Sequence, residues 1–352
     1  MTVRLDGTTA AQVASAISEE RFRQGSSAVG RVLTLVIIAD EATQADAVHA
    51  AARAAREHPC RILTAIPRPG HGPAQLDAEI TVGGSDGLGE LAVLRLRGPL
   101  AHHVESVVLP LLVPDAPVVV WWPGTCPSSP ALDPVGALAQ RRITDSAEHA
   151  RPLKLLQELA DGYVHGDTDL AWTRITPWRA LLASALDEPY DEITRVDVHA
   201  PKTNPSAVLL VSWLEGCLKV PVAIKPSKGP GITGVDIHTT HGDIIVSRPD
   251  GRIAAIARPG MPDREAALPR RSIESLIAEE LRRLDPDDIY DEVLARFAAQ
   301  SAAASVSTTK TTNKDTSTNA PMNKTPAKRT SAKKAASSGK PAPRTSAAKK
   351  SL

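Results

Sequence analysis

The sequence of 352 residues is long enough for two domains and a sizeable core, and its 42% hydrophobic and 23% charged residues are ordinary for a soluble globular protein. Three widely spaced cysteines, Cys60, Cys126 and Cys217, give no support for a disulfide framework or a zinc site and fit a reducing cytosol. The net charge of +1 hides a split, since residues 301–352 hold 11 Lys/Arg and one Asp, whereas the remainder holds 30 basic and 39 acidic residues.

The N-terminal segment and the apolar runs indicate a protein that stays in the cytoplasm. The first residues, MTVRLDGTTAAQV, lack the basic region and apolar run of a signal peptide. The longest apolar runs, such as Val32–Ala39, are far shorter than the roughly 18 residues of a membrane span. We therefore expect a cytoplasmic protein without membrane contact.

The first half of the chain alternates strands and helices. Thr8–Arg23 has the spacing of an amphipathic helix, and Val32–Ala39 is a continuous apolar strand of the kind buried in parallel sheets. Asp40 can cap an Ala-rich helix that follows, and Arg61–Pro67 is the next strand. This order predicts a βαβ unit with a right-handed crossover.

The remaining segments of the first half complete a predicted α/β domain over residues 1–165. Ala78–Val82 and Glu90–Arg97 bracket a Gly-rich turn and indicate a hairpin. Pro99–Leu112 is expected to form a helix and Pro117–Trp122 a buried strand. We predict that the sheet of this domain is mainly parallel.

The second half, residues 166–300, has the pattern of an α+β domain. Pro177 at a first helical position starts one helix, and Ala207–Val220 forms another that can carry Trp213 inward. Short strands separated by turns predict an antiparallel meander, at Ile193–Ala200, Val222–Ile224, Val235–Thr239, Ile244–Arg248 and Ile253–Ala257. Two C-terminal helices follow, Ser272–Leu284 and Pro286–Phe297.

Residues 301–352 form a basic tail rich in Ala, Ser, Thr, Lys and Pro. The tail lacks apolar periodicity, so we expect it to be disordered. Its charge allows weak, non-specific nucleic-acid contact by counterion release, although it has no aromatic residue to stack on bases. The alternative is a solvated tail without a nucleic-acid partner.

No motif in the chain requires catalysis, a metal or a cofactor. The Gly-rich stretches PRPGHGP and GGSDGLGE lack the order of phosphate-binding loops. The pairs His102-His103 and His238/His241 have no Cys or carboxylate partner at ligand spacing. There is no GxSxG elbow and no cysteine in a nucleophile context. We therefore expect a protein that is not an enzyme.

Tryptophan and arginine concentrate in three short segments, which we predict to form a site for a protein partner or a sugar phosphate. Tryptophan beside a planar guanidinium suits the recognition of a phosphate, a carboxylate or a protein. Adjacent tryptophans at a strand end must point to opposite sides of the sheet. The alternative is that the tryptophans are core residues and the arginines form structural ion pairs. The candidate residues are Trp121, Trp122, Arg141, Asp145, Ser146, Trp172, Arg174, Trp178 and Arg179.

The segments VVVWWPG, RRITDS and LAWTRITPWRALLA, in this order, resemble the OpcA family of glucose-6-phosphate dehydrogenase assembly proteins, actinobacterial type. The resemblance covers about residues 1–300 and leaves out the tail. It implies a non-catalytic subunit that promotes the active oligomer of glucose-6-phosphate dehydrogenase in the oxidative pentose phosphate pathway and acts as its effector. The resemblance supplies no catalytic residues. The alternatives are a sugar-phosphate-binding enzyme and a nucleic-acid-binding protein that acts through its basic tail.

Overall fold

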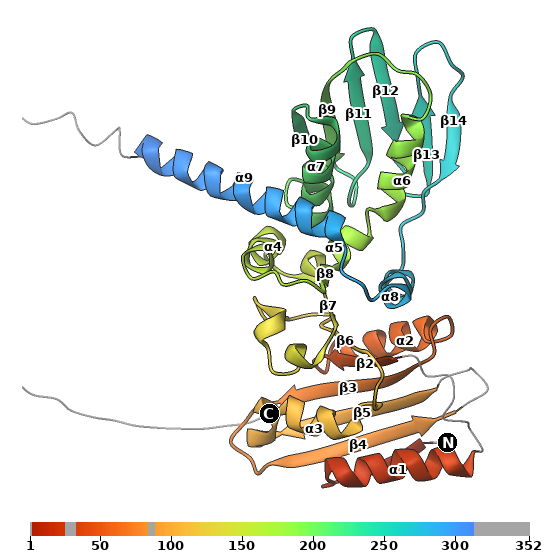
Figure 1. Ribbon diagram of the computed structural model, residues 1–352, viewed down its shortest axis with the longest axis vertical. Coiled ribbons are helices and arrows are strands. Elements are labelled where there is room, and N and C mark those ends of the chain that lie inside the picture. Colours follow the sequence, from red (N-terminus) through yellow and green to blue (C-terminus); the bar gives the residue numbers. More distant parts are fainter. Residues whose placement is uncertain (1, 25–32, 84–88, 313–352) are drawn as a thin grey trace, which may run out of the picture. The chain divides into compact units, whose positions relative to one another are not determined.

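The computed structural model describes residues 2–24, 33–83 and 89–312, and every statement below refers to these ranges. Met1–Ser305 form one compact unit that contains two β-sheets, called sheet A and sheet B here and coloured by sequence in Figure 1. None of the helices in the described ranges is long and apolar enough to cross a lipid bilayer.

Sheet A has eight strands in the order β1-β4-β5-β3-β2-β6-β7-β8. The six strands from β5 to β8 run parallel, whereas β4 pairs antiparallel with β5 and β1 pairs antiparallel with β4. This confirms the predicted, mainly parallel sheet. The strands are β1 (Thr2–Leu5), β2 (Leu33–Ile38), β3 (Cys60–Arg68), β4 (Gln75–Val82), β5 (Glu90–Arg97), β6 (Val118–Trp121), β7 (Arg141–Thr144) and β8 (Asp167–Asp169).

Helices cover both faces of sheet A, which explains the unbroken apolar run of β2. On one face, α1 (Ala10–Arg23) and α3 (Val104–Val108) pack against residues such as Val36. On the other face, α2 (Gln44–Ala54) and α8 (Ile273–Arg282) pack against residues such as Leu35. Successive side chains of a strand point to opposite faces, so both faces of β2 must be apolar. The parallel β2-α2-β3 unit confirms the βαβ prediction.

Two local predictions in the first half differ from the structure in detail. The expected helix over Pro99–Leu112 is divided into η1 (Gly98–His102), α3 and η2 (Leu109–Leu111). His103 has a non-helical backbone, and Pro110 has no N–H to donate within a helix. The predicted hairpin of β4 and β5 is confirmed, but most of its Gly-rich turn, residues 84–88, lies outside the described residues.

Sheet B has six strands in the order β10-β9-β11-β12-β13-β14. The antiparallel meander is confirmed for β9, β11, β12 and β13, and β14, which was not predicted, extends it. Strand β10, expected in the meander, instead pairs parallel with β9, because helix α7 (Pro205–Leu218) connects them as a crossover. The strands are β9 (Ile193–Ala200), β10 (Val222–Pro226), β11 (Gly234–Thr239), β12 (Gly242–Ser247), β13 (Ile253–Ala257) and β14 (Arg264–Ala267).

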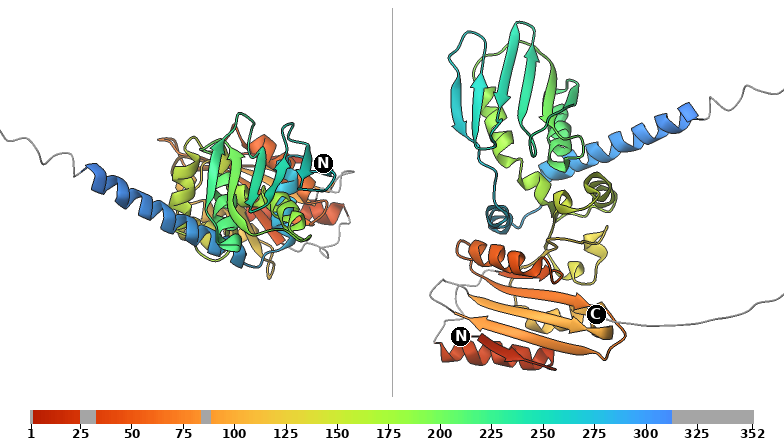
Figure 2. Two further views of the ribbon diagram at one scale, coloured as in Figure 1. Left: turned by 90° about the horizontal axis from the view of Figure 1, so that it is seen from above. Right: turned by 180° about the vertical axis from the view of Figure 1, so that it is seen from behind.

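One face of sheet B is covered by helices. Figures 1 and 2 show α7 and α6 (Thr176–Ala185) along this face, where they join the apolar residues of the strands in one core. Trp213 of α7, expected to point inward, is half-buried and packs against this core. Within sheet A, η3 (Pro130–Leu132) and η4 (Gly136–Leu138) connect β6 to β7, and η5 (Ser146–Glu148) and α4 (Pro152–Asp161) connect β7 to β8. Helix α5 (Leu170–Thr173) follows β8 and precedes α6.

The two C-terminal helices serve different cores. Helix α8 packs against α2 beside sheet A, whereas Tyr290 and Phe297 of α9 (Asp288–Thr312) belong to the core of sheet B. Asp287 caps α9 by accepting the N–H groups of Ile289 and Tyr290 at 3.1 Å and 3.0 Å. The helix continues past residue 301, where the tail was expected to begin, and residues 313–352 lie outside the described ranges. The domain division near residue 165 stays a prediction.

Candidate functional site

The strand order of sheet A reverses between β2 and β6, and sheets with this topology bind ligands where the order reverses. Three parallel strands extend from β2 in one direction and three from β6 in the other, as in dinucleotide-binding sheets. Ligands of such sheets bind at the carboxyl ends of the strands where the order reverses. Here β2 and β6 meet at this switch point, so the segments after Ile38 and Trp121 line it.

A carboxylate of the chain occupies the switch point. Asp40 accepts hydrogen bonds from the backbone N–H groups of Ala42 and Thr43 at 3.0 Å and 2.8 Å, and from the Thr43 hydroxyl at 2.8 Å. The hydrogen bond from the Thr43 side chain is the main cause of a lowered Asp40 pKa. Dinucleotide-binding proteins direct such N–H groups at a pyrophosphate. In this chain those donors already have an anionic partner, which would also repel a phosphate.

The adjacent tryptophans at the end of β6 lie on opposite faces of sheet A, as predicted. Trp121 belongs to the core beneath α2 and α8 and is 1% exposed, whereas Trp122 belongs to the core beneath α1 and α3 and is 2% exposed. Neither tryptophan reaches the surface. Their contacts are those of core residues.

Arg141 and its neighbour Arg142 are buried in ion pairs. Arg141 donates through Nε to Glu280 of α8 at 2.9 Å and through Nη1 to the Asp285 carbonyl at 3.0 Å. Arg142 pairs with Asp167 of β8. Each guanidinium therefore has a carboxylate partner, and together they join β7 to α8 and to β8.

Asp169 connects β8 to β7, and the sequence pattern did not single it out. Its carboxylate accepts hydrogen bonds from the hydroxyls of Thr144 and Ser146 at 2.8 Å each, from the Ser146 N–H at 2.9 Å and from the Ala171 N–H at 2.9 Å. Burial, followed by repulsion from Asp145, raises the pKa of Asp169. The candidate Ser146 thus holds a buried carboxylate in place.

Asp145 and Arg174 form a two-pronged ion pair. The two guanidinium nitrogens lie 2.6 Å and 2.7 Å from the two carboxylate oxygens. Asp145 is 1% exposed, whereas the Arg174 side chain is 26% exposed. The pair links the end of β7 to α5 and leaves one side of the arginine accessible.

The other two candidate tryptophans are buried beneath arginines. The guanidinium carbon of Arg179 lies 3.7 Å from the centre of the Trp172 ring, and the Trp172 indole N–H donates to Asp287 at 2.8 Å. The guanidinium carbon of Arg248 lies 4.9 Å from the centre of the Trp178 ring. Each of these tryptophans therefore has an arginine over its ring, but not the arginine next to it in the sequence, and Arg248 comes from a distant part of the chain.

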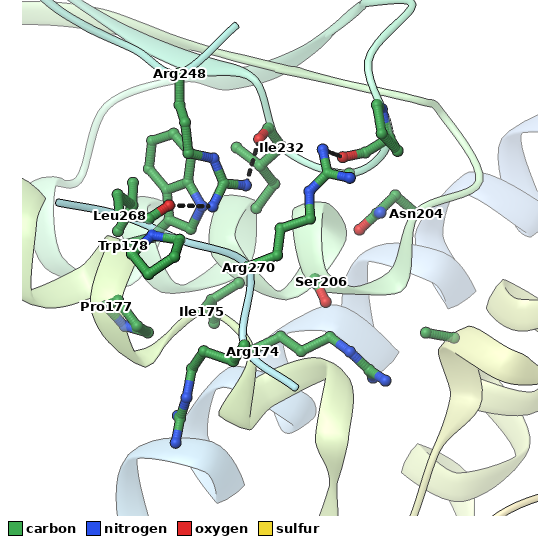
Figure 3. A pocket seen from close by; sticks show the side chains of 15 residues that line it. Arg174, Ile175, Pro177, Trp178, Asn204, Ser206, Ile232, Arg248, Leu268 and Arg270 are labelled. Carbon is green, nitrogen blue, oxygen red and sulfur yellow. Dashed lines mark hydrogen bonds between the residues drawn. The ribbon is translucent and has the colours of Figure 1, made fainter. Parts of the chain in front are cut away.

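A cavity of about 240 Å³ opens beside Trp178, and we call it the arginine pocket (Figure 3). Its charged lining comes from the residues directly after α5 and β12 and from the segment before α8. Asn204 and Ser206, at the N-terminus of α7, line it as well. In the view of Figure 3, Arg270 and Asn204 lie on one side of Ser206 and Arg174 lies on the other. The arginines are Arg174, Arg248, Arg270 and Arg271.

The four arginines of the pocket differ in how their charge is neutralised. Arg174 pairs with Asp145, and Arg271 pairs with Glu279. Arg248 donates to the carbonyls of Leu268 and Ile232 at 3.0 Å and 2.8 Å, and Arg270 donates to the Pro230 carbonyl. Among the described residues, no carboxylate forms an ion pair with Arg248 or Arg270. Burial, followed by repulsion from Arg270, lowers the pKa of Arg248 to about 10.

The structure thus brings part of the predicted set together at the pocket. Arg174 and Trp178 line it, whereas Trp121, Trp122 and Arg141 lie elsewhere. Sequence reasoning missed Arg248 and Arg270, because Arg248 directly follows a short strand and Arg270 lies in a Pro/Arg segment without periodicity. The only signal for Arg248 was an arginine at the end of an apolar strand. The binding role of the full set stays a prediction.

Two domain families match the chain, one after the other. Both are described as domains of a glucose-6-phosphate dehydrogenase subunit of OpcA type. The N-terminal domain family matches residues 51–161, and the C-terminal domain family matches residues 165–294.

Curated relatives show further similarity. A protein described as a putative OxPP cycle protein OpcA from Nostoc punctiforme is 30% identical over 193 residues, which is 50% of this chain and 41% of the relative. The protein of the same description from Synechocystis is 27% identical over 195 residues, or 51% and 41%. The chain thus spans about two fifths of the length of these relatives.

Among solved structures, a 3-ketoreductase from Actinomadura kijaniata has a TM-score of 0.42 at 12% identity, covering 76% of this chain and 95% of its own. A dehydrogenase from Clostridium difficile has a TM-score of 0.42 at 8% identity, covering 79% and 99%.

The two domain matches together span more than half of the 352 residues, and the chain belongs to the OpcA family.

Proposed function

We propose that the protein is a non-catalytic assembly and activating subunit of glucose-6-phosphate dehydrogenase, acting in the oxidative pentose phosphate pathway in the cytoplasm. The observation that carries this proposal is the pair of domain matches, which follow each other along the chain and both carry the description of a dehydrogenase subunit. The description of the cyanobacterial relatives as OxPP cycle proteins supports the same pathway.

The geometry of sheet A supports a role other than dinucleotide chemistry. Asp40 takes the N–H donors at the switch point, and Arg141 and Arg142 are used in buried ion pairs. A fold alone does not determine a function, so the proposal depends on these side chains. Their hydrogen bonds and ion pairs hold the structure together, which is a structural role and not that of an acid, a base or a nucleophile.

An activating subunit works by binding one state of its partner more tightly than another. The dehydrogenase then shifts toward the tightly bound state, by no more than the difference in binding free energy. If the active state is the larger oligomer, the subunit raises activity and oligomer size together. This coupling distinguishes an assembly role from simple stabilisation.

Among the predicted binding residues, Arg174 and Arg179 are the best candidates for contact with a partner. Both side chains are partly exposed, whereas the four tryptophans, Arg141, Asp145 and Ser146 are buried. Arg179 is the cleaner residue to change, because Arg174 also neutralises the buried Asp145.

The test mixes the purified chain with glucose-6-phosphate dehydrogenase from the same organism. Oligomer size is measured by sedimentation velocity and activity by NADPH formation, each with and without glucose 6-phosphate. We expect a larger dehydrogenase species and higher activity, both weakened by Arg179→Ala and unchanged by Arg252→Ala, an exposed arginine outside the predicted binding residues. Absence of a complex and of any kinetic change would contradict the proposal, as would turnover of a sugar phosphate by the chain alone.

A further inference from the structure

We propose that the arginine pocket binds a small phosphate monoester or free phosphate through Arg248, Arg270 and the N-terminus of α7. The inference stands apart from the proposed dehydrogenase role, because it concerns a property of the isolated chain. It depends on the charge, the hydrogen-bond donors and the walls of one cavity.

Arg248 is a buried cation that forms no ion pair with a carboxylate of the described residues, although the charge of Asp250, two residues further on, partly favours its protonated form. The residue is 6% exposed, and its two terminal nitrogens donate to backbone carbonyls. Its Nε–H is buried and has no hydrogen-bond partner in the described ranges. A charge removed from water is unfavourable unless a charge of opposite sign and further hydrogen bonds compensate it. An anion in the pocket would supply both.

Arg270 adds a second cation at the same cavity. Its guanidinium donates to the Pro230 carbonyl, and its charge is close enough to Arg248 to disfavour the protonated form of that residue. Two like charges without an anion between them repel each other. An anion that contacts both guanidinium groups would turn this repulsion into attraction.

The N-terminus of α7 faces the same cavity. Asn204 is the N-cap of this 14-residue helix, and Ser206 is the second helical residue; both line the pocket. The Asn204 side chain accepts the N–H of Ala207 at 2.9 Å. The positive end of a helix dipole and the hydroxyl of Ser206 are typical partners of phosphate oxygens.

The charge and the walls of the pocket define the ligand class. Arg248 and Arg270, which have no carboxylate partner in the described part of the chain, match the roughly two negative charges of a phosphate monoester near pH 7, because its second pKa is about 6. An apolar wall, on which a short carbon chain or sugar ring can pack, is formed by Ile175, Pro177, Ile232 and Leu268. A cavity of about 240 Å³ favours a small ligand.

The pocket also connects separate parts of the compact unit. Ala147 and Arg174 belong to the segments that follow β7 and β8 of sheet A, whereas Arg248 follows β12 of sheet B. A bound anion would therefore bridge elements that pack against the two sheets. This placement suits a ligand that changes how firmly the two sheets are held together.

The test measures binding to the full chain by isothermal titration calorimetry at constant ionic strength. The probes are inorganic phosphate and glucose 6-phosphate, with glucose and sodium acetate as controls. We expect saturable binding of at least one phosphate probe and none of glucose. Tighter binding of glucose 6-phosphate identifies a monoester site, and equal binding identifies a site for the phosphate group alone.

Matched variants locate the binding. Arg270 is exposed, so Arg270→Gln should fold normally and should lower the affinity about tenfold or more, the effect of losing one charge-assisted hydrogen bond. The exposed Arg252, which does not line the pocket, supplies the control Arg252→Gln, for which we expect no change. The proposal is overturned if neither phosphate probe binds at concentrations up to about 10 mM, which corresponds to a very weak affinity. It is also overturned if both variants bind phosphate equally.

Discussion

The arginines buried between β7 and α8 and the arginines of the pocket have the same side chain in different electrostatic surroundings. Arg141 and Arg142 each have a carboxylate partner, Glu280 and Asp167, and all four side chains are at most 10% exposed. Arg248 is equally buried but bonds only to carbonyls within the described ranges and lies over a tryptophan ring. The comparison shows that burial of an arginine does not by itself indicate a ligand site, because Arg141 and Arg142 are buried in ion pairs.

The switch point of sheet A gives the opposite case. There the fold suggests a phosphate site, but Asp40 supplies the anion from within the chain. At the arginine pocket, Arg248 and Arg270 are cations that donate to backbone carbonyls and form no ion pair with a carboxylate of the described residues. If phosphate binds at the arginine pocket as we propose, the charge balance of the side chains and not the strand order sets the position of the site.

The largest expected effect comes from removing Glu280, the carboxylate partner of the buried Arg141. Glu280→Ala leaves Arg141 buried without its partner and removes the acceptor of the Thr173 hydroxyl, which lies at 2.5 Å. We expect a loss of about 3–5 kcal/mol in the free energy of unfolding, measured by urea denaturation. Glu274→Ala on the same helix is the control, with an expected loss below about 1 kcal/mol. Equal losses would show that the buried pair has no special weight.

A smaller effect should follow from filling the pocket. A ligand that binds only the folded state stabilises that state by about 1.4 kcal/mol when its free concentration is ten times its dissociation constant. Phosphate should therefore raise the melting temperature of the wild-type chain, whereas Arg270→Gln should show little shift. A shift of the same size in both proteins would place the bound phosphate outside the pocket.

The smallest effect concerns the switch point. Asp40→Ala removes the acceptor of the Ala42 and Thr43 N–H groups, and we expect a loss of about 1 kcal/mol at pH 7. Because the folded-state pKa of Asp40 lies below its ordinary value of 3.8, this stability is complete above pH 3.8 and declines as the pH falls through the lowered pKa. Urea denaturation at a series of pH values should show the wild type and variant converging in acid. A difference in the free energy of unfolding that stays constant with pH would contradict a stabilising role of the ionised Asp40 carboxylate.

Local patterns were enough to predict much of the fold. The apolar run of β2, the Ala-rich helix α2 and the alternation in β9 depend on neighbouring residues, and their positions were predicted within a few residues. Strand β14 was not predicted, because Arg264–Ala267 is a short polar segment at a sheet edge without alternating hydrophobicity. The parallel pairing of β10 depends on a crossover, which strand pattern alone does not reveal.

The site was less predictable, because its residues are distant in sequence. The Trp/Arg segments were predicted to form one binding site, but pattern alone left open whether their residues were core or surface, and the four tryptophans are buried in three separate cores. Arg174, Asn204, Arg248 and Arg270 meet only through the packing of α7 and sheet B against α5 and α6. Whether an arginine has an ion-pair partner depends on carboxylates such as Asp145 and Glu280, which only the fold brings close to it.

A crystal structure of the chain grown with phosphate would test most directly whether the unbalanced arginines mark the ligand site. The account predicts an anion within hydrogen-bond distance of Arg248 and Arg270, beside Ser206 at the N-terminus of α7. A pocket without an anion, together with phosphate bound at the switch point beside Asp40, would contradict it.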